Sequence, residues 1–465
     1  MSITLEKAAQ TRLRMIRETS EANRHALAQH LTPPEVATLA ASMFCVQGRD
    51  LRCLDLGCGT GMLSVALYER FGQRIQKIDA IDADPSLADV YDSELRGLVD
   101  GRTFVGDALA PHYQWRSGYD VIILNPPYKK MAANDPRQAL LPVRSPNLYA
   151  AFIMVAVSCL ANNGEAVAII PRSWMNGEYF APFRRYVLDR CSLDAMHVYG
   201  SRDEIFSDTK VLQETMVVRF TRGKRQSDHI LVGQTEIKNE TAVVHEYPAE
   251  SLITGPDRVV RIFPQEHTSR LGTVEGKRLC PSTGKVVDFR SREHILSEFV
   301  PGCDAVPLLY AGNFRSGTLR HPLSFGKGQW LIITDSLAER QLCMPGAYVV
   351  VKRFTAKEEK RRVVAYPLAV DRPVALENHL SFLHQGTPRE VVPLRSKELA
   401  QGLSAWLNTT FVDDWFRGVS GSTQVNAGDI RKMPCPALDE LELLGTKWHP
   451  GMTQEETDSL FQGVI

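Results

Sequence analysis

A glycine-rich turn between a strand-like run and a helix-like run constrains the fold of this chain more than any other segment. The apolar run LRCLDL (51–56) predicts a short buried strand, and the spacing of apolar residues in 62–71 predicts a helix. Between them, Gly57, Gly59 and Gly61 allow the backbone to approach a ligand closely and helix N–H groups to face it. The spacing is GxGxG rather than the GxGxxG of dinucleotide sites, and no Gly-Lys-Ser/Thr follows for a phosphate loop. A site for a nucleotide-like cofactor is therefore one hypothesis for this turn.

The apolar pattern continues to alternate between strand and helix periodicity. Nearly continuous apolar strands are typical of parallel sheets, because crossover helices cover both faces of such sheets. The first half of the chain is therefore expected to be an α/β domain, with a Rossmann-like, doubly wound sheet and helices on both faces. Further strands are predicted at 77–82, 102–105, 119–124, 165–170 and 193–199, and helices at 86–99, 147–161 and 183–190.

The alternation stops at the polar stretch TRGKRQSD (221–228), which is interpreted as a linker. Beyond it the predicted strands are short and Pro and Gly are frequent, so an irregular α+β domain is expected. The acidic tail is expected to form a packed or solvated helix. The predicted parts are a helical N-terminal segment (1–30), the α/β domain (31–222), the α+β domain (223–438) and the acidic tail (439–465).

Charge is distributed unevenly along the chain. Its 465 residues carry 54 Lys+Arg and 54 Asp+Glu, which gives a formal net charge of zero. Residues 1–223 are balanced, whereas 224–432 carry a net charge of +5 and 433–465 a net charge of −5. The neutral total therefore does not exclude a polyanionic partner for the second half.

The composition argues against membrane and metal chemistry. No run of about 18 apolar residues predicts a membrane span, and the N-terminus has no apolar signal-peptide core. The nine cysteines include no CxxC pair, so reduced and mostly buried thiols are favoured over disulfides or zinc. A cytoplasmic protein that needs no metal and contacts no membrane is expected.

Acidic side chains follow the next two predicted strands. Asp82 ends the second strand, where a carboxylate can accept hydrogen bonds from both hydroxyls of a ribose. Asp84 is an alternative for that role, or both residues cap the helix that begins near Ser86. Asp107 follows the third strand and can accept a hydrogen bond from the exocyclic amine of an adenine, or can simply shape a turn.

The tetrapeptide Asn125-Pro126-Pro127-Tyr128 directly follows the strand predicted at 119–124. Ligands bind at the carboxyl ends of the strands in open α/β sheets, so this segment is expected to face the glycine turn. An exocyclic amine is a poor nucleophile because its lone pair is delocalised. The Asn125 side-chain oxygen and the Pro126 carbonyl can accept its two hydrogens and return electron density to the nitrogen. The prolines fix both acceptors, and Tyr128 offers a ring on which a planar base can stack.

These motifs together resemble the S-adenosylmethionine-dependent N6-adenine DNA methyltransferases of type II restriction–modification systems. The resemblance covers about residues 31–220, and NNGEAVAIIPRSW (162–174) is similar to the strand and loop that follow the catalytic motif in that family. It implies a seven-stranded methyltransferase sheet, followed by a C-terminal α+β target-recognition domain. It also implies direct transfer of the methyl group to the N6 amine of an adenine that has been flipped out of the duplex.

The resemblance assigns individual residues as well. Asn125, Pro126, Pro127 and Tyr128 would be catalytic, and Phe206 would stack on the extruded base, although it could equally anchor the core. S-adenosylmethionine would be the cofactor, with Thr32 and Asp55 near its methionine end, Asp82 at its ribose and Asp107 at its adenine. The cofactor-binding residues that the resemblance implies are Thr32, Asp55, Gly57, Gly59, Gly61, Asp82 and Asp107.

Two segments of the second half are candidates for contact with double-stranded DNA. Six basic and two acidic residues lie between Lys352 and Arg362, and phosphate contact is at least as well supported there as an ordinary solvated surface. The segment Ser420–Gln424 is small and polar, so its backbone can approach a strand, while Gln424 and Asn426 either contact DNA or cap a turn. The candidates are Lys352, Arg353, Arg361, Arg362, Ser422 and Gln424.

Other functions remain as alternatives at this point. NPPY enzymes also methylate protein glutamine or RNA, and a catalytically silent DNA-binding modification subunit could keep the same fold. No nuclease motif is found, so any restriction endonuclease partner is expected to be a separate polypeptide. Pro434-Cys435 resembles the nucleophile of a C5-cytosine methyltransferase, but it lies far from the cofactor half and is rejected.

Overall fold

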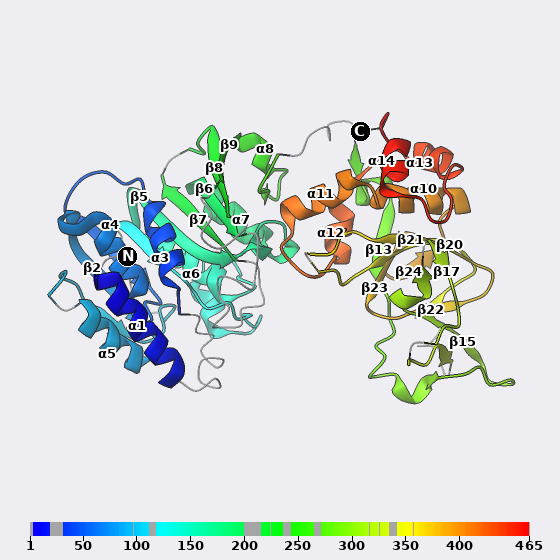
Figure 1. The fold of residues 1–465 in the computed structure, drawn as a ribbon, viewed down its shortest axis with the longest axis horizontal. Helices are drawn as coiled ribbons and strands as arrows, with labels where there is room; N and C mark the ends of the chain where they lie inside the picture. Colours follow the sequence, from blue (N-terminus) through cyan, green and yellow to red (C-terminus); the bar gives the residue numbers. More distant parts are fainter. Residues whose placement is uncertain are drawn as a thin grey trace. The chain divides into compact units, whose positions relative to one another are not determined.

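The computed structural model of the chain contains two compact units, Met1–Pro264 and Gln265–Ile465 (Figure 1). The structure describes residues 3–18, 31–95, 97–110, 118–199, 215–223, 225–235, 243–264, 271–315, 317–324, 326–333, 342–356 and 358–464.

The first unit is built on a nine-stranded sheet with the strand order β3-β2-β1-β4-β5-β7-β6-β8-β9. The strands β3, β2, β1, β4 and β5 pair with one another in parallel. The strand β7 lies between β5 and β6 and is antiparallel to both. The predicted α/β architecture is therefore confirmed, although the sheet is larger than the seven strands expected. Its strands are β1 Leu51–Leu56, β2 Ile75–Asp82, β3 Thr103–Val105, β4 Tyr119–Leu124, β5 Leu160–Pro171, β6 Cys191–Tyr199, β7 Thr215–Arg222, β8 His229–Thr235 and β9 Val243–Pro248.

Helices cover both faces of this sheet because its inner strands are apolar on both sides. In β4, Val121 and Ile123 pack with α1, α3 and α4, whereas Ile122 and Leu124 pack with α6 and α7. Such two-sided burial explains why the predicted strands read as continuous apolar runs. The helices of this unit are α1 Ile3–Glu18, α3 Pro34–Ser42, α4 Met62–Phe71, α5 Pro85–Leu95, α6 Leu148–Cys159, α7 Ala181–Leu188 and α8 Ala249–Leu252.

The boundary between the units lies after Pro264 rather than after residue 222. The polar stretch 221–228 is a connection inside one sheet, because β8 pairs with β6 in parallel. The Gln226 side chain accepts a hydrogen bond from the Leu193 backbone N–H at 3.0 Å and donates to the Leu193 carbonyl at 2.8 Å. Through these contacts Gln226, in the stretch interpreted as a linker, is attached to β6. A polar composition alone does not reveal such an attachment.

The second unit contains two five-stranded sheets and a group of helices. The first sheet consists of β13 Leu279–Thr283, β20 Gly346–Lys352, β21 Ala365–Val370, β23 Leu380–Thr387 and β24 Glu390–Val392. The second sheet consists of β14 Ile295–Leu296, β15 Ala305–Leu309, β18 Trp330–Ile332, β19 Leu342–Cys343 and β22 Val374–Leu376. The helices are α10 Lys397–Leu407, α11 Thr410–Val419, α12 Ala427–Lys432, α13 Leu438–Gly445 and α14 Gln454–Leu460.

The acidic tail is part of the second unit and forms the packed helices α13 and α14. α13 packs against α10, which lies along β20 and β21, and α14 packs against α11 (Figure 1). A Cβ added at Gly402 would lie 1.8 Å from the Leu441 carbonyl oxygen, so only glycine allows α10 and α13 this approach. The unit therefore holds 24 Lys+Arg and 23 Asp+Glu, and the positive segment and the acidic tail nearly cancel within one body.

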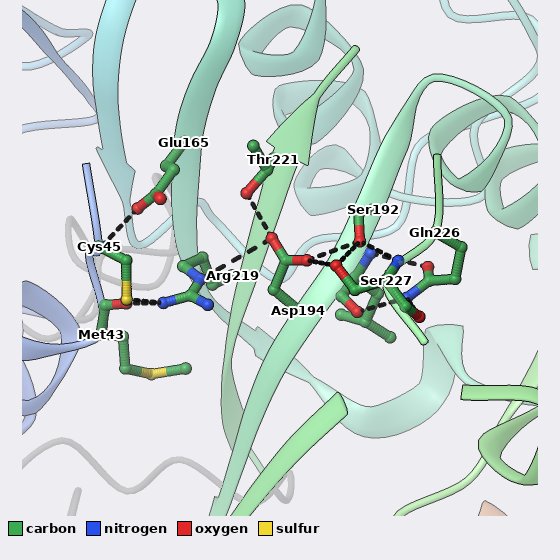
Figure 2. Close-up of polar contacts among 10 residues, drawn as sticks. Met43, Cys45, Glu165, Ser192, Asp194, Arg219, Thr221, Gln226 and Ser227 are labelled. Carbon is green, nitrogen blue, oxygen red and sulfur yellow. Dashed lines mark hydrogen bonds and ion pairs between the residues drawn. The ribbon is translucent and has the colours of Figure 1, made fainter. Parts of the chain in front are cut away.

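Buried charged side chains fasten the end of α3 to the sheet of the first unit (Figure 2). Arg219 on β7 is 8% exposed, and its Nη1 donates to the Met43 carbonyl at 2.5 Å and reaches the Cys45 sulfur. On β5, Glu165 accepts a hydrogen bond from the Cys45 backbone N–H at 2.7 Å. Asp194 on β6 lies 4.0 Å from the Arg219 guanidinium and also accepts hydrogen bonds from neighbouring hydroxyls. The segment that follows α3 is thus held by groups from three strands.

Replacing Arg219 with Ala is expected to lower the free energy of unfolding by about 2–4 kcal/mol, because it removes a buried cation and its hydrogen bonds to the α3 segment. Urea denaturation measures this loss. Arg185→Ala is the matched control, since its partner Asp257 and Arg185 itself are both more than 40% exposed. That control is expected to cost less than about 1 kcal/mol. Equal losses in the two variants would contradict a clamping role for Arg219.

Candidate active site

The glycine turn between β1 and α4 is tied to the neighbouring strand β2 by its backbone. The N–H groups of Gly57 and Cys58 both donate to the Ile81 carbonyl, at 2.9 and 3.0 Å. Gly61 has φ of 84°, and a Cβ there would lie 3.1 Å from the Tyr91 ring. A side chain would therefore be strained at this position and would also crowd α5, which explains why glycine precedes the first residue of α4.

Asp82 lies at the carboxyl end of β2 with its carboxylate against the glycine turn. Its Oδ2 accepts a hydrogen bond from the Gly59 N–H at 2.8 Å, and its Oδ1 accepts one from the Asp84 N–H at 2.9 Å. Burial raises the pKa of Asp82, and the two N–H donors oppose that rise. Asp84 instead accepts from the N–H and the hydroxyl of Ser86, which is a capping contact at the start of α5.

Asp55 is fully buried on β1 beneath the turn. Its Oδ2 accepts a hydrogen bond from the Ser64 hydroxyl at 2.7 Å, and the Tyr91 hydroxyl lies 3.0 Å from that same hydroxyl. Its Oδ1 has no hydrogen-bond partner among the described residues. Burial raises the pKa of Asp55 from 3.8 to about 7. A buried carboxylate with a vacant acceptor suits a ligand that brings a cation or a hydrogen-bond donor.

The side-chain amide of Asn125, at the carboxyl end of β4, is oriented by two hydroxyl groups. Its Nδ2 donates to Thr32 Oγ1 at 3.0 Å, and its Oδ1 accepts from the Tyr128 hydroxyl at 2.9 Å. Tyr128 also contacts the Ile169 carbonyl at 3.2 Å and lies edge-on to Tyr149. Burial raises the pKa of Tyr128, so its hydroxyl remains a donor at neutral pH. The amide nitrogen is thereby directed to Thr32 and the amide oxygen to Tyr128.

One pocket at the carboxyl ends of β1, β2 and β4 brings most of the predicted site together. Thr32, Gly57, Gly59, Asp82, Asn125 and Pro127 all line it. Sequence reasoning missed its apolar wall, where Phe152 comes from a helix that is apolar on every side and therefore gives no signal. Met62 and Leu63 could have been found, because they are the first residues after the glycine turn. The other lining residues are Leu31, Cys58, Thr60, Ala83 and Leu87.

Other predicted site residues lie outside this lining. Asp55 and Gly61 are beneath and beside the turn, and Pro126 is buried after β4. The Asp107 carboxylate pairs with the Arg137 guanidinium at 2.9 Å and accepts a hydrogen bond from the Leu109 N–H. Asp107 thus acts as a turn residue and an ion-pair partner in this structure. Phe206 lies outside the described residues.

Several cations of the basic run in the second unit are engaged by oxygen atoms of the same unit. Arg362 is 1% exposed, and its guanidinium contacts the Thr355 hydroxyl at 3.2 Å and the Ser422 carbonyl. Arg361 donates to the Asn408 carbonyl at 2.6 Å, and Lys352 pairs with Glu359 at 2.8 Å. The Arg362 guanidinium is therefore engaged by oxygen atoms of its own unit, and its contact with phosphate stays a prediction.

Cys435 is buried on β25 (Pro434–Cys435), and burial raises the pKa of its thiol to about 12, which opposes a nucleophilic role. Within the described ranges, no group of three or more His, Cys, Asp or Glu side chains is placed to hold a metal ion. Those ranges also contain no helix that is long and apolar enough to cross a membrane.

Known proteins resemble this chain over nearly its whole length. The Eco57I restriction-modification methylase family matches residues 64–206. The type II methyltransferase M.BsuBI of Bacillus subtilis is 34% identical over 468 residues, which cover 92% of this chain and 90% of that protein. The type II methyltransferase M.PstI of Providencia stuartii is 32% identical over 462 residues, which cover 91% of this chain and 89% of that protein.

A solved structure extends the likeness to the fold. The type IIL restriction-modification enzyme MmeI, solved in complex with DNA, superposes with a TM-score of 0.55 at 13% identity. The superposition covers 99% of this chain and 73% of that enzyme, and at this identity it shows the fold alone. With sequence identity of 34% and 32% to two type II methyltransferases over most of both chains, this protein belongs to the type II DNA methyltransferases of restriction–modification systems.

Proposed function

We propose that this protein transfers the methyl group of S-adenosylmethionine to the N6 amine of a specific adenine in double-stranded DNA. The observation that carries the proposal is the shared pocket of Asp82, Asn125 and the glycine turn. Asp82 offers acceptors for a ribose, and Asn125 offers an acceptor for an amine at the same sheet edge. The family membership supports DNA as the substrate, rather than RNA or a protein glutamine.

The residues of the pocket, together with Asp55 beneath the glycine turn, fit the proposed cofactor. The Asp55 Oδ1, which is buried without a described partner, suits the ammonium group of the methionine part. Both oxygens of Asp82 keep a lone pair after accepting their backbone hydrogen bonds, so they can bind a pair of ribose hydroxyls. Phe152 and Leu87 supply apolar surface for a flat ring. When bound, S-adenosylmethionine supplies a methyl group that its positively charged sulfur makes electrophilic.

The proposed role of the protein in the transfer is to activate and orient the amine. Asn125 Oδ1 and the Pro126 carbonyl accept the two N–H hydrogens, which returns electron density to the nitrogen. The Tyr128 hydroxyl and Thr32 fix the Asn125 amide, so that its oxygen does not exchange places with its nitrogen. Tyr128 and Phe206 are proposed to stack on the adenine, which must leave the duplex to reach the pocket.

The proposal also includes a cellular setting. A separately encoded restriction endonuclease would cleave the same sequence, and methylation would protect host DNA from it. The expected location is the cytoplasm, where the DNA and S-adenosylmethionine are found. Asp107 is proposed to bind the adenine of the cofactor, because each of its oxygens keeps a lone pair beside its hydrogen bond to Arg137 or to the Leu109 N–H.

Incubation with labelled S-adenosylmethionine and plasmid DNA, followed by digestion to nucleosides, is expected to yield N6-methyladenine. Asn125→Ala is expected to lower the rate of transfer by at least about 100-fold, because it removes one of the two acceptors. Its cofactor affinity should stay within a few-fold of wild type. Asn134→Ala, an exposed asparagine in the same unit, is the control and should retain full activity. Methylcytosine as the product would refute the adenine assignment.

Thr32→Val is expected to lower kcat about tenfold, because the Asn125 amide loses a hydrogen bond that orients it. The dissociation constant of S-adenosylmethionine should change less than twofold, and Thr32→Ser should restore kcat. Single-turnover kinetics and calorimetry separate the two quantities. A weaker cofactor affinity with an unchanged kcat would instead make Thr32 a direct contact of the cofactor.

The affinity for S-adenosylmethionine is expected to rise between pH 5.5 and pH 7.5. The pKa of Asp55 is about 7 in the free protein, and a bound ammonium group lowers it, so binding below pH 7 must release a proton. The dissociation constant should fall about tenfold across this range, below the pH at which the amino group itself loses its charge. Asp55→Asn should bind more weakly at pH 7.5 and show a flat profile. Parallel profiles for both proteins would exclude Asp55 as the titrating group.

A further inference from the structure

Three segments of the second unit, distant in sequence, form one continuous backbone platform. The N–H of Arg353 donates to the His379 carbonyl at 3.0 Å, and the N–H of Val425 donates to the Arg353 carbonyl at 2.8 Å. Phe354 and Gln424 form a β-bridge between two of the segments. These contacts fix the backbones of 353–355, 377–379 and 423–425 relative to one another. We call these three segments the 353/379/424 platform.

The imidazole of His379 is exposed on this platform but is held by a buried carboxylate. The side chain of His379 is 51% exposed, while that of Glu377 is 2% exposed. Glu377 Oε2 accepts a hydrogen bond from the His379 N–H at 3.0 Å, and Glu377 Oε1 contacts Nδ1 of the ring. Burying a carboxylate costs free energy unless its oxygens accept hydrogen bonds. Both oxygens of Glu377 contact His379, one at its backbone N–H and one at its ring. This arrangement fixes the ring of His379. Its Nε2 takes part in none of the described hydrogen bonds.

Aromatic packing restricts the ring further and places other polar groups beside it. The Phe354 ring lies 4.8 Å from the His379 ring, and the Arg353 guanidinium lies 5.6 Å from the Phe354 ring. Residues opposite each other in a β-bridge project to the same side, so the half-buried Gln424 side chain lies beside Phe354. The described contacts give the Gln424 amide no hydrogen-bond partner of its own. An imidazole, a guanidinium and an amide thus surround one aromatic ring.

We propose that the 353/379/424 platform reads base edges in a groove of double-stranded DNA, with His379 and Gln424 as the residues that determine sequence specificity. This inference rests on one part of the proposed function, namely that DNA is the substrate, and does not depend on which base is methylated. Glutamine side chains pair with adenine edges. The His379 ring is held before binding by Glu377 and Phe354, and the Gln424 amide is available for a base edge on the same fixed backbone. Arg361 and Arg362, which would otherwise be available for phosphates, donate to the carbonyl oxygens of Asn408 and Ser422.

Selection of bound sequences from a pool of randomised DNA duplexes tests the proposal without reference to the base that is methylated. Wild-type protein should select one sequence. His379→Ala and Gln424→Ala should each lose preference at one or two base pairs of that sequence, by about 5–100-fold against the wrong base. The slope of log affinity against log salt should stay unchanged, because no phosphate contact is removed. Single-molecule sequencing of methylated plasmid DNA should show the same relaxed positions.

Control variants separate base reading from loss of fold. His294→Ala removes an exposed histidine beside Glu293 in the same unit and should leave the selected sequence unchanged. His379→Gln keeps a polar side chain over Glu377, and its melting temperature should match wild type while its selected sequence changes. Uniform weakening on all duplexes with a smaller salt slope would make the platform a phosphate contact and overturn the proposal. An unchanged selected sequence in His379→Ala and Gln424→Ala would overturn it as well. A product other than N6-methyladenine would refute the proposed function alone.

Discussion

The parallel pairing of β1 with β2 and β4 is the constraint on which the candidate site depends. It brings the carboxyl ends of three strands to one edge, so the glycine turn, Asp82 and Asn125 line one pocket although they are far apart in sequence. The hydrogen bond from Gly59 to Asp82 then joins the first two of these strand ends directly. Apolar residues on both faces of the strands stabilise this sheet, because the helices that pack on each face remove those residues from water.

Buried polar groups position the segment before β1 on this frame. Thr32 reaches Asn125 from the start of α3, and Arg219 and Glu165 hold the chain just after the same helix. Charged groups inside a sheet cost desolvation free energy, so their hydrogen bonds to the α3 segment are what compensate for that cost. Arg219 and Glu165 thus stabilise the α3 segment, and Thr32 contacts the Asn125 amide from just before that helix.

The second unit shows where reasoning from sequence fails. The basic run from Lys352 to Arg362 joins β20 to β21, and composition does not say which way each guanidinium points. Arg362 turns inward because the buried Thr355 hydroxyl and the Ser422 carbonyl accept its hydrogen bonds there. In the same way, nothing in the sequence marks Glu377 as buried or joins His379 to Phe354. The acidic tail, too, has no pattern that shows its packing against α10.

The sequence by itself determined the local elements and the chemistry of the motifs. β1, α4 and β4 begin and end where the apolar periodicity predicted, since that periodicity reflects burial, and glycine is needed where φ is positive. Only the tertiary structure decided the extension of the sheet to β8 and β9, the partners of Asn125 and the inward turn of Arg362. Those features depend on contacts between residues distant in sequence, whose geometry is set by the packing of whole elements and not by any local pattern.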